Sequence, residues 1–304
     1  MRKEIIIRKF VTFCNSPQII LKKIWMLFEP IISDKLFLKV YFRLRVGYWP
    51  DLRNPKSFNE KLQWLKLNDI HSEYTKMVDK IEAKKYVASI IGDKYIIPTL
   101  GTWNSVDEID WDSLPNQFVI KVTSDSGGIV VCNDKMKLDI EEAKAKLLHG
   151  WGKNYYKFNK EYPYKDVKPR IIAEQYMEDE SGWQLKDYKI FCFNGEPHFI
   201  EVDYDRYVAH KLNVYDLDWN FIDFYMTSPN DKNVKIEKPK KLDLMLQLAK
   251  KLSHNIPFLR VDFYSINSNI YFGELTFFPG SGMIDFHPKE YDKIVGEMLK
   301  LSNK

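Results

Sequence analysis

The feature that most constrains the fold is a stretch near the C-terminal end, residues 260–277, which reads RVDFYSINSNIYFGELTF. Two runs rich in β-branched and aromatic residues flank the triplet Asn267-Ser268-Asn269, and this pattern predicts a β-hairpin with a tight turn. We expect Ile266 to pair with Ile270 across that turn. The pairing matters because it decides which charged side chains meet further along the two strands.

In this register two carboxylates lie opposite each other, Asp262 and Glu274, and Arg260 lies opposite Thr276. Like charges in such pairs repel, because their Cβ atoms are only about 4.5–5.5 Å apart. A Mg²⁺ ion would remove the repulsion, since it typically accepts one or two carboxylates together with substrate phosphates. The hydroxyl of Thr276 points to the same face as Glu274 and can support the site. A second interpretation stays open, in which Asp262 pairs with Arg260 and Glu274 is solvated.

A second feature is a glycine-containing loop between the predicted strands 118–121 and 129–132. Backbone N–H groups of such a loop can surround phosphate oxygens, and Lys121 at the end of the first strand adds positive charge. The loop is not a P-loop, because GxxxxGK[ST] is absent and a strand follows it instead of a helix. A plain hairpin turn is the alternative. The loop consists of Ser124, Asp125, Ser126, Gly127 and Gly128.

The rest of the chain alternates helices and strands with frequent hairpins, which is typical of an α+β or mixed-sheet enzyme of two or three lobes. Ser57 and Glu60 form a capping box at the start of a helix. A helix capped by Asp139 is predicted to run to Gly150 and to bury Ile140, Ala143, Leu147 and Leu148. Two strands are predicted over 170–177 and 189–193, the second followed by a turn at Asn194-Gly195. The remaining predicted elements are a helix over 75–91, a loop over 151–169, a helix from Pro239 to about Asn255 and a last helix after Pro288.

Charge and cysteine content narrow the class of protein. The net charge of +4 is too small to indicate nucleic acid as the main partner. The three cysteines form no CxxC pair, which favours a reducing compartment, and no apolar run of about 18 residues exists, so we expect a cytoplasmic protein. Residues 1–50 carry ten Lys and Arg against three acidic residues. They form either a basic helical subdomain packed on the body or a peripheral contact with the inner membrane face.

Taken together, these elements resemble the ATP-grasp enzymes, and more narrowly the TupA-like ATP-grasp family, which is named for teichuronopeptide synthesis. The resemblance implies an α+β ATP-grasp fold that holds the nucleotide between two α+β lobes. We expect a basic helical N-terminal segment at 1–75, a central lobe with the phosphate-binding loop at 76–175, and a C-terminal lobe with the metal-binding hairpin at 176–304. The phrases that carry the resemblance are PKSFNEKLQWLKL (55–67), DKIEAKKYV (79–87), FVIKVTSDSGG (118–128), DRYVAHKLNVYDLDW (205–219) and RVDFYSINSNIYFGELTFFPGSG (260–282).

The resemblance also implies that the protein uses ATP and Mg²⁺. Two lysines match those that contact nucleotide phosphates, and the glycine-containing loop matches the one that closes over the triphosphate. An acidic residue matches the hinge between lobes, the three residues after it give backbone contacts to adenine, and Asp187, or Glu178 in its place, contacts the ribose. The expected nucleotide-binding residues are Lys80, Lys121, Ser124, Asp125, Ser126, Gly127, Gly128, Glu174, Gln175, Tyr176, Met177 and Asp187.

By the same resemblance, Lys121, Lys189 and Arg260 are the expected catalytic residues, and the last two face the transferred phosphate. Asp262, Glu274 and Thr276 are the expected metal site, although many ATP-grasp enzymes have Asn where Thr276 stands. The substrate residues are expected in the charged stretch EVDYDRYVAHKL, where an arginine can clamp a carboxylate; a solvated charged loop is the alternative. They are Asp203, Arg206, His210 and Lys211.

The activity that the resemblance implies is activation of a carboxylate as an acylphosphate, followed by attack of an amine to form an amide in capsule or cell-surface polysaccharide biosynthesis. The absence of a convincing Ser/His/Asp or Cys/His set fits this chemistry, which needs no nucleophilic side chain. We expect small-molecule substrates, one of them a sugar derivative, and the sequence leaves a homodimer open. Two alternatives are a sugar or small-molecule kinase on the same fold and a non-catalytic nucleotide-binding scaffold.

Overall fold

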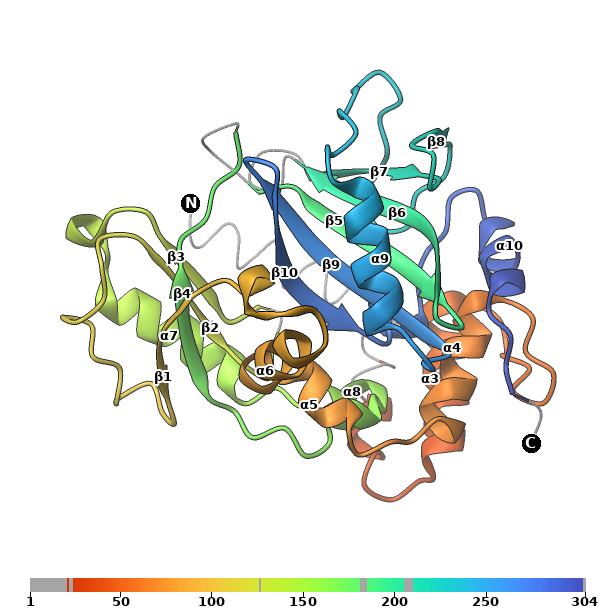
Figure 1. Cartoon of the computed structure of the whole chain (residues 1–304). Coiled ribbons are helices and arrows are strands. Elements are labelled where there is room, and N and C mark those ends of the chain that lie inside the picture. Colours follow the sequence, from red (N-terminus) through yellow and green to blue (C-terminus); the bar gives the residue numbers. More distant parts are fainter. Residues whose placement is uncertain (1–20, 22–23, 126, 181–184, 205–209, 303–304) are drawn as a thin grey trace.

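The computed structural model describes residues 21, 24–125, 127–180, 185–204 and 210–302, and its strands form two antiparallel sheets (Figure 1). The smaller sheet has the order β1-β4-β2-β3, and the larger has the order β10-β9-β5-β6-β7-β8. The strands are β1 (Thr99–Trp103), β2 (Phe118–Val122), β3 (Ile129–Cys132), β4 (Ile171–Gln175), β5 (Asp187–Phe193), β6 (Glu196–Tyr204), β7 (Lys211–Tyr215), β8 (Phe221–Ile222), β9 (Phe258–Ile266) and β10 (Asn269–Thr276).

The turn between β9 and β10 is tighter than predicted. Ile266 pairs with Asn269, so the expected pairing of Ile266 with Ile270 is wrong. Asn267 and Ser268 adopt φ values of 48° and 62°, and two consecutive left-handed residues make a two-residue hairpin turn. Asparagine tolerates this region well, which explains why the turn needs no glycine.

Further along the hairpin a β-bulge at Gly273 restores the predicted register. Beyond the bulge Asp262 lies opposite Glu274, and Arg260 lies opposite Thr276. The shorter turn and the bulge each shift the pairing by one residue, in opposite directions. Glycine suits the bulge because a Cβ there would lie 3.1 Å from the carbonyl oxygen of Asp262. The predicted opposition of two carboxylates is therefore confirmed.

Two helix starts depend on local capping. The capping box of Ser57 and Glu60 is confirmed. The single helix predicted over 75–91 is two helices, because Asp79 breaks it and accepts hydrogen bonds from the backbone N–H groups of Ile81 and Glu82 at 2.9 and 3.1 Å. The helices are α3 (Asp34–Val46), α4 (Phe58–Asn68), α5 (Tyr74–Val78), α6 (Lys80–Ile91), α7 (Ile140–Trp151), α8 (Tyr155–Asn159), α9 (Leu242–Leu252) and α10 (Tyr291–Met298).

Two other predictions about helices need correction. The stretch 151–169, predicted as a loop, contains α8 and the 3₁₀ turn Tyr162–Tyr164. On α7, Ile140 and Leu148 are exposed, although the amphipathic pattern predicts them buried. Within the part of the chain that is described, no helix has the length and the apolar content that crossing a membrane requires.

The two sheets have separate hydrophobic cores. The smaller core joins β2, β3 and β4 to α7, and the larger joins the six-stranded sheet to α4, α5, α6 and α9. Helix α6 lies between the two sheets and contacts β10 and α9 (Figure 1). Residues 58–95 thus pack on the larger sheet. The three-part division of the chain at residues 75 and 175 stays a prediction.

Candidate functional site

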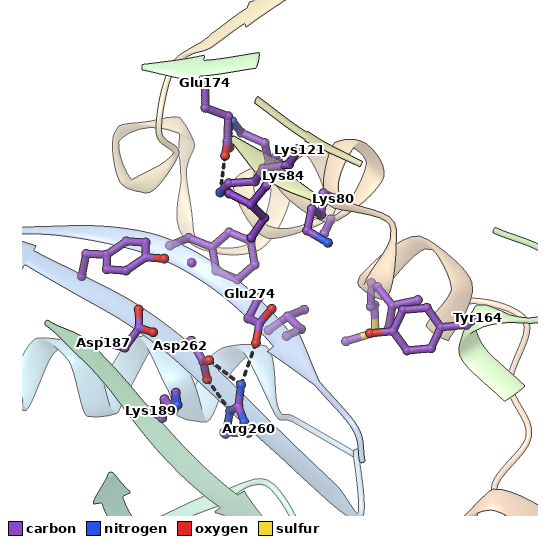
Figure 2. Close-up of a pocket in the computed structure, with 18 residues that line it drawn as sticks. Lys80, Lys84, Lys121, Tyr164, Glu174, Asp187, Lys189, Arg260, Asp262 and Glu274 are labelled. Carbon is purple, nitrogen blue, oxygen red and sulfur yellow. Dashed lines mark hydrogen bonds and ion pairs between the residues drawn. The ribbon is translucent and has the colours of Figure 1, made fainter. Parts of the chain in front are cut away.

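A cavity of about 290 Å³ lies between the two sheets, with α6 at its edge (Figure 2). Side chains from β2 and β4 of the smaller sheet face side chains from β5, β9 and β10 of the larger one. The lining is strongly charged, with cations and carboxylates interspersed. Its polar members are Lys80, Lys84, Lys121, Tyr164, Glu174, Asp187, Lys189, Arg260, Asp262, Tyr264 and Glu274.

On the β9–β10 wall, Arg260 bridges the two opposed carboxylates. Its guanidinium donates to both oxygens of Asp262 at 2.7 and 2.6 Å and to Oε1 of Glu274 at 2.6 Å. Burial and the nearby charge of Glu274 raise the pKa of Asp262 to about 8, although Arg260 acts in the opposite direction. The side chain of Glu274 is 50% exposed. Burial acts to raise its pKa, but Arg260 and Lys80 hold the pKa of Glu274 below its usual value.

The donor set of this wall fits a particular kind of metal site. Among the described residues no group of three or more His, Cys, Asp or Glu side chains could hold a metal ion. Asp262 and Glu274 provide two carboxylates, and Mg²⁺ is commonly bound by one or two carboxylates plus substrate phosphates. Thr276 donates its hydroxyl to Glu274 at 3.2 Å but does not line the cavity. The residues therefore fit a magnesium ion that arrives with phosphate ligands.

On the opposite wall, Glu174 holds two lysines. Lys84 on α6 lies 2.6 Å from one carboxylate oxygen, and Lys121 on β2 lies 2.6 Å from the other. Glu174 is only 7% exposed. Burial alone would raise its pKa, but the two ammonium groups lower the pKa of Glu174 to about 2. The sequence analysis missed Lys84, although its spacing of four residues from Lys80 places both on one face of the helix.

Lys80 connects the cavity to the glycine-containing loop. Its ammonium donates to the backbone carbonyl of Asp125 at 2.6 Å. The side chain of Asp125 is buried and closes the loop on itself, because it accepts hydrogen bonds from the backbone N–H of Gly128 at 2.7 Å, from Lys153 at 3.1 Å and from Tyr155 at 3.1 Å. Burial acts to raise its pKa, but Lys153 lowers the pKa of Asp125 overall. The carboxylate therefore has a structural role in the loop.

One polar atom of the loop lacks a partner. The hydroxyl oxygen of Ser124 is buried and makes no hydrogen bond with any residue that the structure describes. Leaving such a group without a partner costs roughly 1–3 kcal/mol. A hydroxyl that can donate a hydrogen bond suits an anionic ligand, so Ser124 fits a phosphate group.

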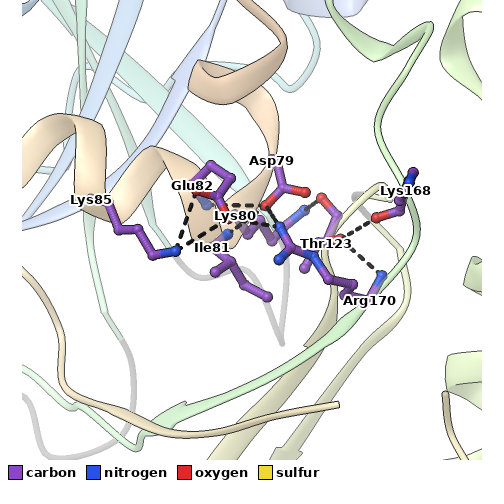
Figure 3. Close-up of polar contacts among 8 residues, drawn as sticks. All are labelled: Asp79, Lys80, Ile81, Glu82, Lys85, Thr123, Lys168 and Arg170. Carbon is purple, nitrogen blue, oxygen red and sulfur yellow. Dashed lines mark hydrogen bonds and ion pairs between the residues drawn. The ribbon is translucent and has the colours of Figure 1, made fainter. Parts of the chain in front are cut away.

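Behind the cavity, Arg170 ties α6 to the base of the loop (Figure 3). Its guanidinium lies 2.9 Å from Asp79 and 3.1 Å from Glu82. Its backbone N–H donates to the hydroxyl of Thr123 at 3.1 Å, and its carbonyl accepts from the backbone N–H of Thr123 at 2.9 Å. Because Asp79 starts α6 at Lys80, this network sets the position of Lys80 relative to the loop. The sequence analysis missed Arg170.

A row of charged residues continues from the cavity across the larger sheet. Lys189 on β5 lies beside Asp262 in register, and its ammonium pairs with Glu201 at 3.1 Å and with Asp203. Burial acts to lower the pKa of Lys189, but these carboxylates raise it. His210 follows, with Nε2 3.3 Å from Asp203. Two of the expected substrate residues, Asp203 and His210, thus connect to the cavity through Lys189.

Only some of the expected site residues line the cavity. It brings together Lys80, Lys121, Glu174, Asp187, Lys189, Arg260, Asp262 and Glu274. The sequence analysis missed Lys84, Tyr164 and Tyr264, all of which line it. Ser126 and Arg206 lie outside the described residues. The expected residues that do not line this cavity are Ser124, Asp125, Gly127, Gly128, Gln175, Tyr176, Met177, Thr276, Asp203, His210 and Lys211, the last of which pairs with Asp231 at 2.7 Å.

Two antiparallel sheets that enclose a cavity of lysines and acidic residues define an α+β fold of the ATP-grasp class. The family described as TupA-like ATPgrasp matches residues 60–300, so the chain belongs to the TupA-like ATP-grasp family. The resemblance predicted from the sequence is confirmed. The ATP-grasp fold implies ATP binding and usually Mg²⁺. No functionally curated protein matches the sequence.

Similar solved structures include ATP-grasp ligases at low identity. The D-alanine–D-alanine ligase from Bacillus anthracis complexed with ATP is 13% identical, with a TM-score of 0.41 over 73% of this chain and 63% of that one. The ATP-grasp ligase PsnB, complexed with minimal precursor, Mg and ADP, is 11% identical, with a TM-score of 0.37 over 77% and 60%. Phosphoribosylamine–glycine ligase from Thermotoga maritima is 14% identical, with a TM-score of 0.40 over 67% and 48%. The chain spans less than two thirds of the length of each.

Proposed function

We propose that the protein is a Mg-ATP-dependent ligase that joins a carboxylate to an amine through an acylphosphate. The observation that carries the proposal is one arrangement: the Arg260–Asp262–Glu274 cluster faces Lys80 and Lys121 across a single cavity. Cations on both walls can offset the charge of a triphosphate, and the two carboxylates suit the magnesium ion that accompanies it. Family membership supports the same class of chemistry.

In this proposal the chain binds the nucleotide along the smaller sheet. Lys80, Lys121 and the loop Ser124–Gly128 hold the phosphates, and backbone groups of Gln175, Tyr176 and Met177, directly after β4, hold the adenine. Asp187 at the start of β5 contacts the ribose. Asp262 and Glu274 hold Mg²⁺, with Thr276 in support. When bound, Mg-ATP supplies the phosphoryl group that activates the carboxylate.

Lys121, Lys189 and Arg260 act on the reacting groups. Burial acts to lower the pKa of Arg260, but Asp262 and Glu274 raise it above its usual range, so the guanidinium keeps its charge throughout. Such fixed cations stabilise charge that develops during phosphoryl transfer. The amine then forms a C–N bond as the C–O bond to phosphate breaks. Orthophosphate leaves, and the nitrogen gives up a proton.

For the second substrate we propose Asp203, His210 and Lys211 near the end of the charged row, together with Arg206, which lies outside the described residues. The contacts of the Asp203 carboxylate with Lys189 and His210 support a substrate site next to the proposed phosphoryl site. We propose that the acid and the amine are an amino acid and a sugar or uronic acid, joined during capsule or cell-surface polysaccharide biosynthesis.

The test is a paired screen of amino acids against uronic acids and nucleotide-linked sugars, scored by phosphate release and mass spectrometry. ADP and phosphate should form only when both an acid and an amine are present, and hydroxylamine should trap the acylphosphate. Lys121→Ala should weaken ATP binding, as measured by calorimetry. Formation of ADP together with a stable phosphorylated sugar would instead identify a kinase. Tight ATP binding without turnover on any pair would identify a scaffold.

A further inference from the structure

The described residues ahead of the family match carry a cluster of exposed apolar side chains. Leu27 and Ile31 are 75% and 79% exposed, and three neighbouring residues are close to half exposed. Side chains of this size are seldom clustered in water without a partner. We call this cluster the N-terminal apolar surface; it consists of Ile24, Leu27, Phe28, Ile31 and Leu36.

The same segment is firmly packed on the body through its other face. Phe37, Leu38 and Phe42 are fully buried. The indole N–H of Trp25 donates to the carbonyl oxygen of Phe37 at 3.3 Å, and the two rings are stacked with centroids 6.3 Å apart. The segment therefore has one apolar face that contacts the protein and a second that does not. Both alternatives drawn from the sequence, a packed subdomain and a membrane contact, can hold at once.

The acidic and basic residues of the segment differ in whether they form ion pairs with the body. Within residues 24–50, the two acidic residues, Glu29 and Asp34, both pair with one buried lysine of the body, Lys160. Tyr156 also donates to Asp34, at 2.9 Å. The basic residues of the segment have no such partners: none of them forms an ion pair with a residue inside the described ranges. They are Lys35, Lys39, Arg43 and Arg45.

We propose that the N-terminal apolar surface docks onto an anionic lipid bilayer. Its aliphatic and aromatic side chains would enter the interface, while the cations that form no ion pair within the described ranges would contact lipid headgroups. A second copy of the chain is a poorer occupant, because a two-fold interface would bring the same cations against each other. Residues 1–20 are also poor candidates to cover this surface, since they carry four Lys and Arg against one acidic residue and would repel its cations. The inference does not depend on the ligase proposal.

Flotation of the full chain with vesicles tests the proposal. The protein should float with phosphatidylcholine vesicles that contain 30% phosphatidylglycerol, far less with phosphatidylcholine alone, and less again in 0.5 M salt, because salt screens the headgroup contacts. The double variant Leu27→Asp/Ile31→Asp should lower the affinity for anionic vesicles at least about tenfold. The matched control is Met136→Asp, at a side chain that is 92% exposed on another part of the molecule, and it should bind as the wild type does.

Several results would overturn the proposal. Absence of flotation with anionic vesicles would do so, as would an equal loss of binding in the double variant and in Met136→Asp. If light scattering finds a dimer that Leu27→Asp/Ile31→Asp converts to a monomer, the surface belongs to a second copy. Circular dichroism and ATP calorimetry on every variant separate a loss of membrane binding from a loss of folding, since none of the substituted residues lines the cavity.

Discussion

Replacing Glu174 with glutamine should destabilise the protein strongly at neutral pH. The carboxylate is almost completely buried, and each of its oxygens lies 2.6 Å from a lysine ammonium, of Lys84 and of Lys121. Glutamine has the same shape but no charge, and its amide nitrogen would place a donor against one of the two cations. Two ammonium groups would then lie in a partly buried site without a counterion.

The magnitude follows from the pKa of Glu174, which the lysines bring from an ordinary value of 4.5 to about 2 despite burial. At about 1.4 kcal/mol per pH unit, this shift corresponds to roughly 3 kcal/mol of unfolding free energy. Removing one member of a buried ion pair typically costs about 3–5 kcal/mol, which agrees. Because the folded-state pKa is depressed, the stabilisation is present above pH 4.5 and is lost as the pH falls towards 2. Between pH 5.5 and 3.5 about 1 kcal/mol of it should disappear.

Urea unfolding followed by circular dichroism at pH 7.0, 5.5 and 3.5 measures this effect. The gap between wild type and Glu174→Gln should be roughly 3 kcal/mol at pH 7.0 and should narrow at pH 3.5. Glu237→Gln is the control, because that side chain is 84% exposed and its loss should be close to neutral. A gap under about 1 kcal/mol at pH 7.0, or one that stays constant with pH, would refute the reasoning.

Three further predictions concern the loop, its support and the metal. Gly150→Ala should cost about 1–3 kcal/mol of stability in thermal unfolding, because its Cβ would lie 2.8 Å from both the Asp125 carboxylate and the Gly128 backbone. The control Gly152→Ala places its Cβ in open space and should be neutral, so equal losses in the two variants would contradict the prediction. Arg170→Ala should weaken ATP binding in calorimetry by on the order of tenfold, since Arg170 positions Lys80, and Arg170→Lys should recover part of the affinity. An unchanged affinity in Arg170→Ala would show that Arg170 does not position Lys80 for binding. Asp262→Asn and Glu274→Gln should each abolish Mg-dependent ATP turnover while circular dichroism still shows a folded protein, and full turnover in either would rule out the metal proposal.

Local signals in the sequence predicted much of the fold. The Ser57–Glu60 capping box, the Asp139 helix cap and the Asn194-Gly195 turn all depend on residues within a few positions of each other, and all three are confirmed. The prediction of one helix over 75–91 was wrong because two local preferences compete there. Asp79 lies inside a helical pattern, but its side chain caps the following turn better than it continues the helix before it.

Parts of the site were predictable for the same reason. Alternation along β9 and β10 places Asp262 and Glu274 on one face of the hairpin, and the family's phrases locate Lys80, Lys121 and Glu174. Nothing in the spacing shows that one arginine, Arg260, contacts both carboxylates, since that depends on the conformations of the three side chains. The spacing from Lys80 indicates the helix face of Lys84 but not its ion pair, because its partner lies ninety residues away on a strand of the smaller sheet.

By itself, the sequence determined many of the elements, the opposition of two acidic residues on one hairpin, and the family. Each of these follows from neighbours along the chain or from an alternating pattern within one strand pair. The tertiary structure decided which cation each carboxylate contacts, which charged residues meet in the cavity, and which apolar residues of the N-terminal segment stay outside the core. These outcomes depend on how the two sheets and α6 pack together, and packing brings together side chains that no local pattern relates.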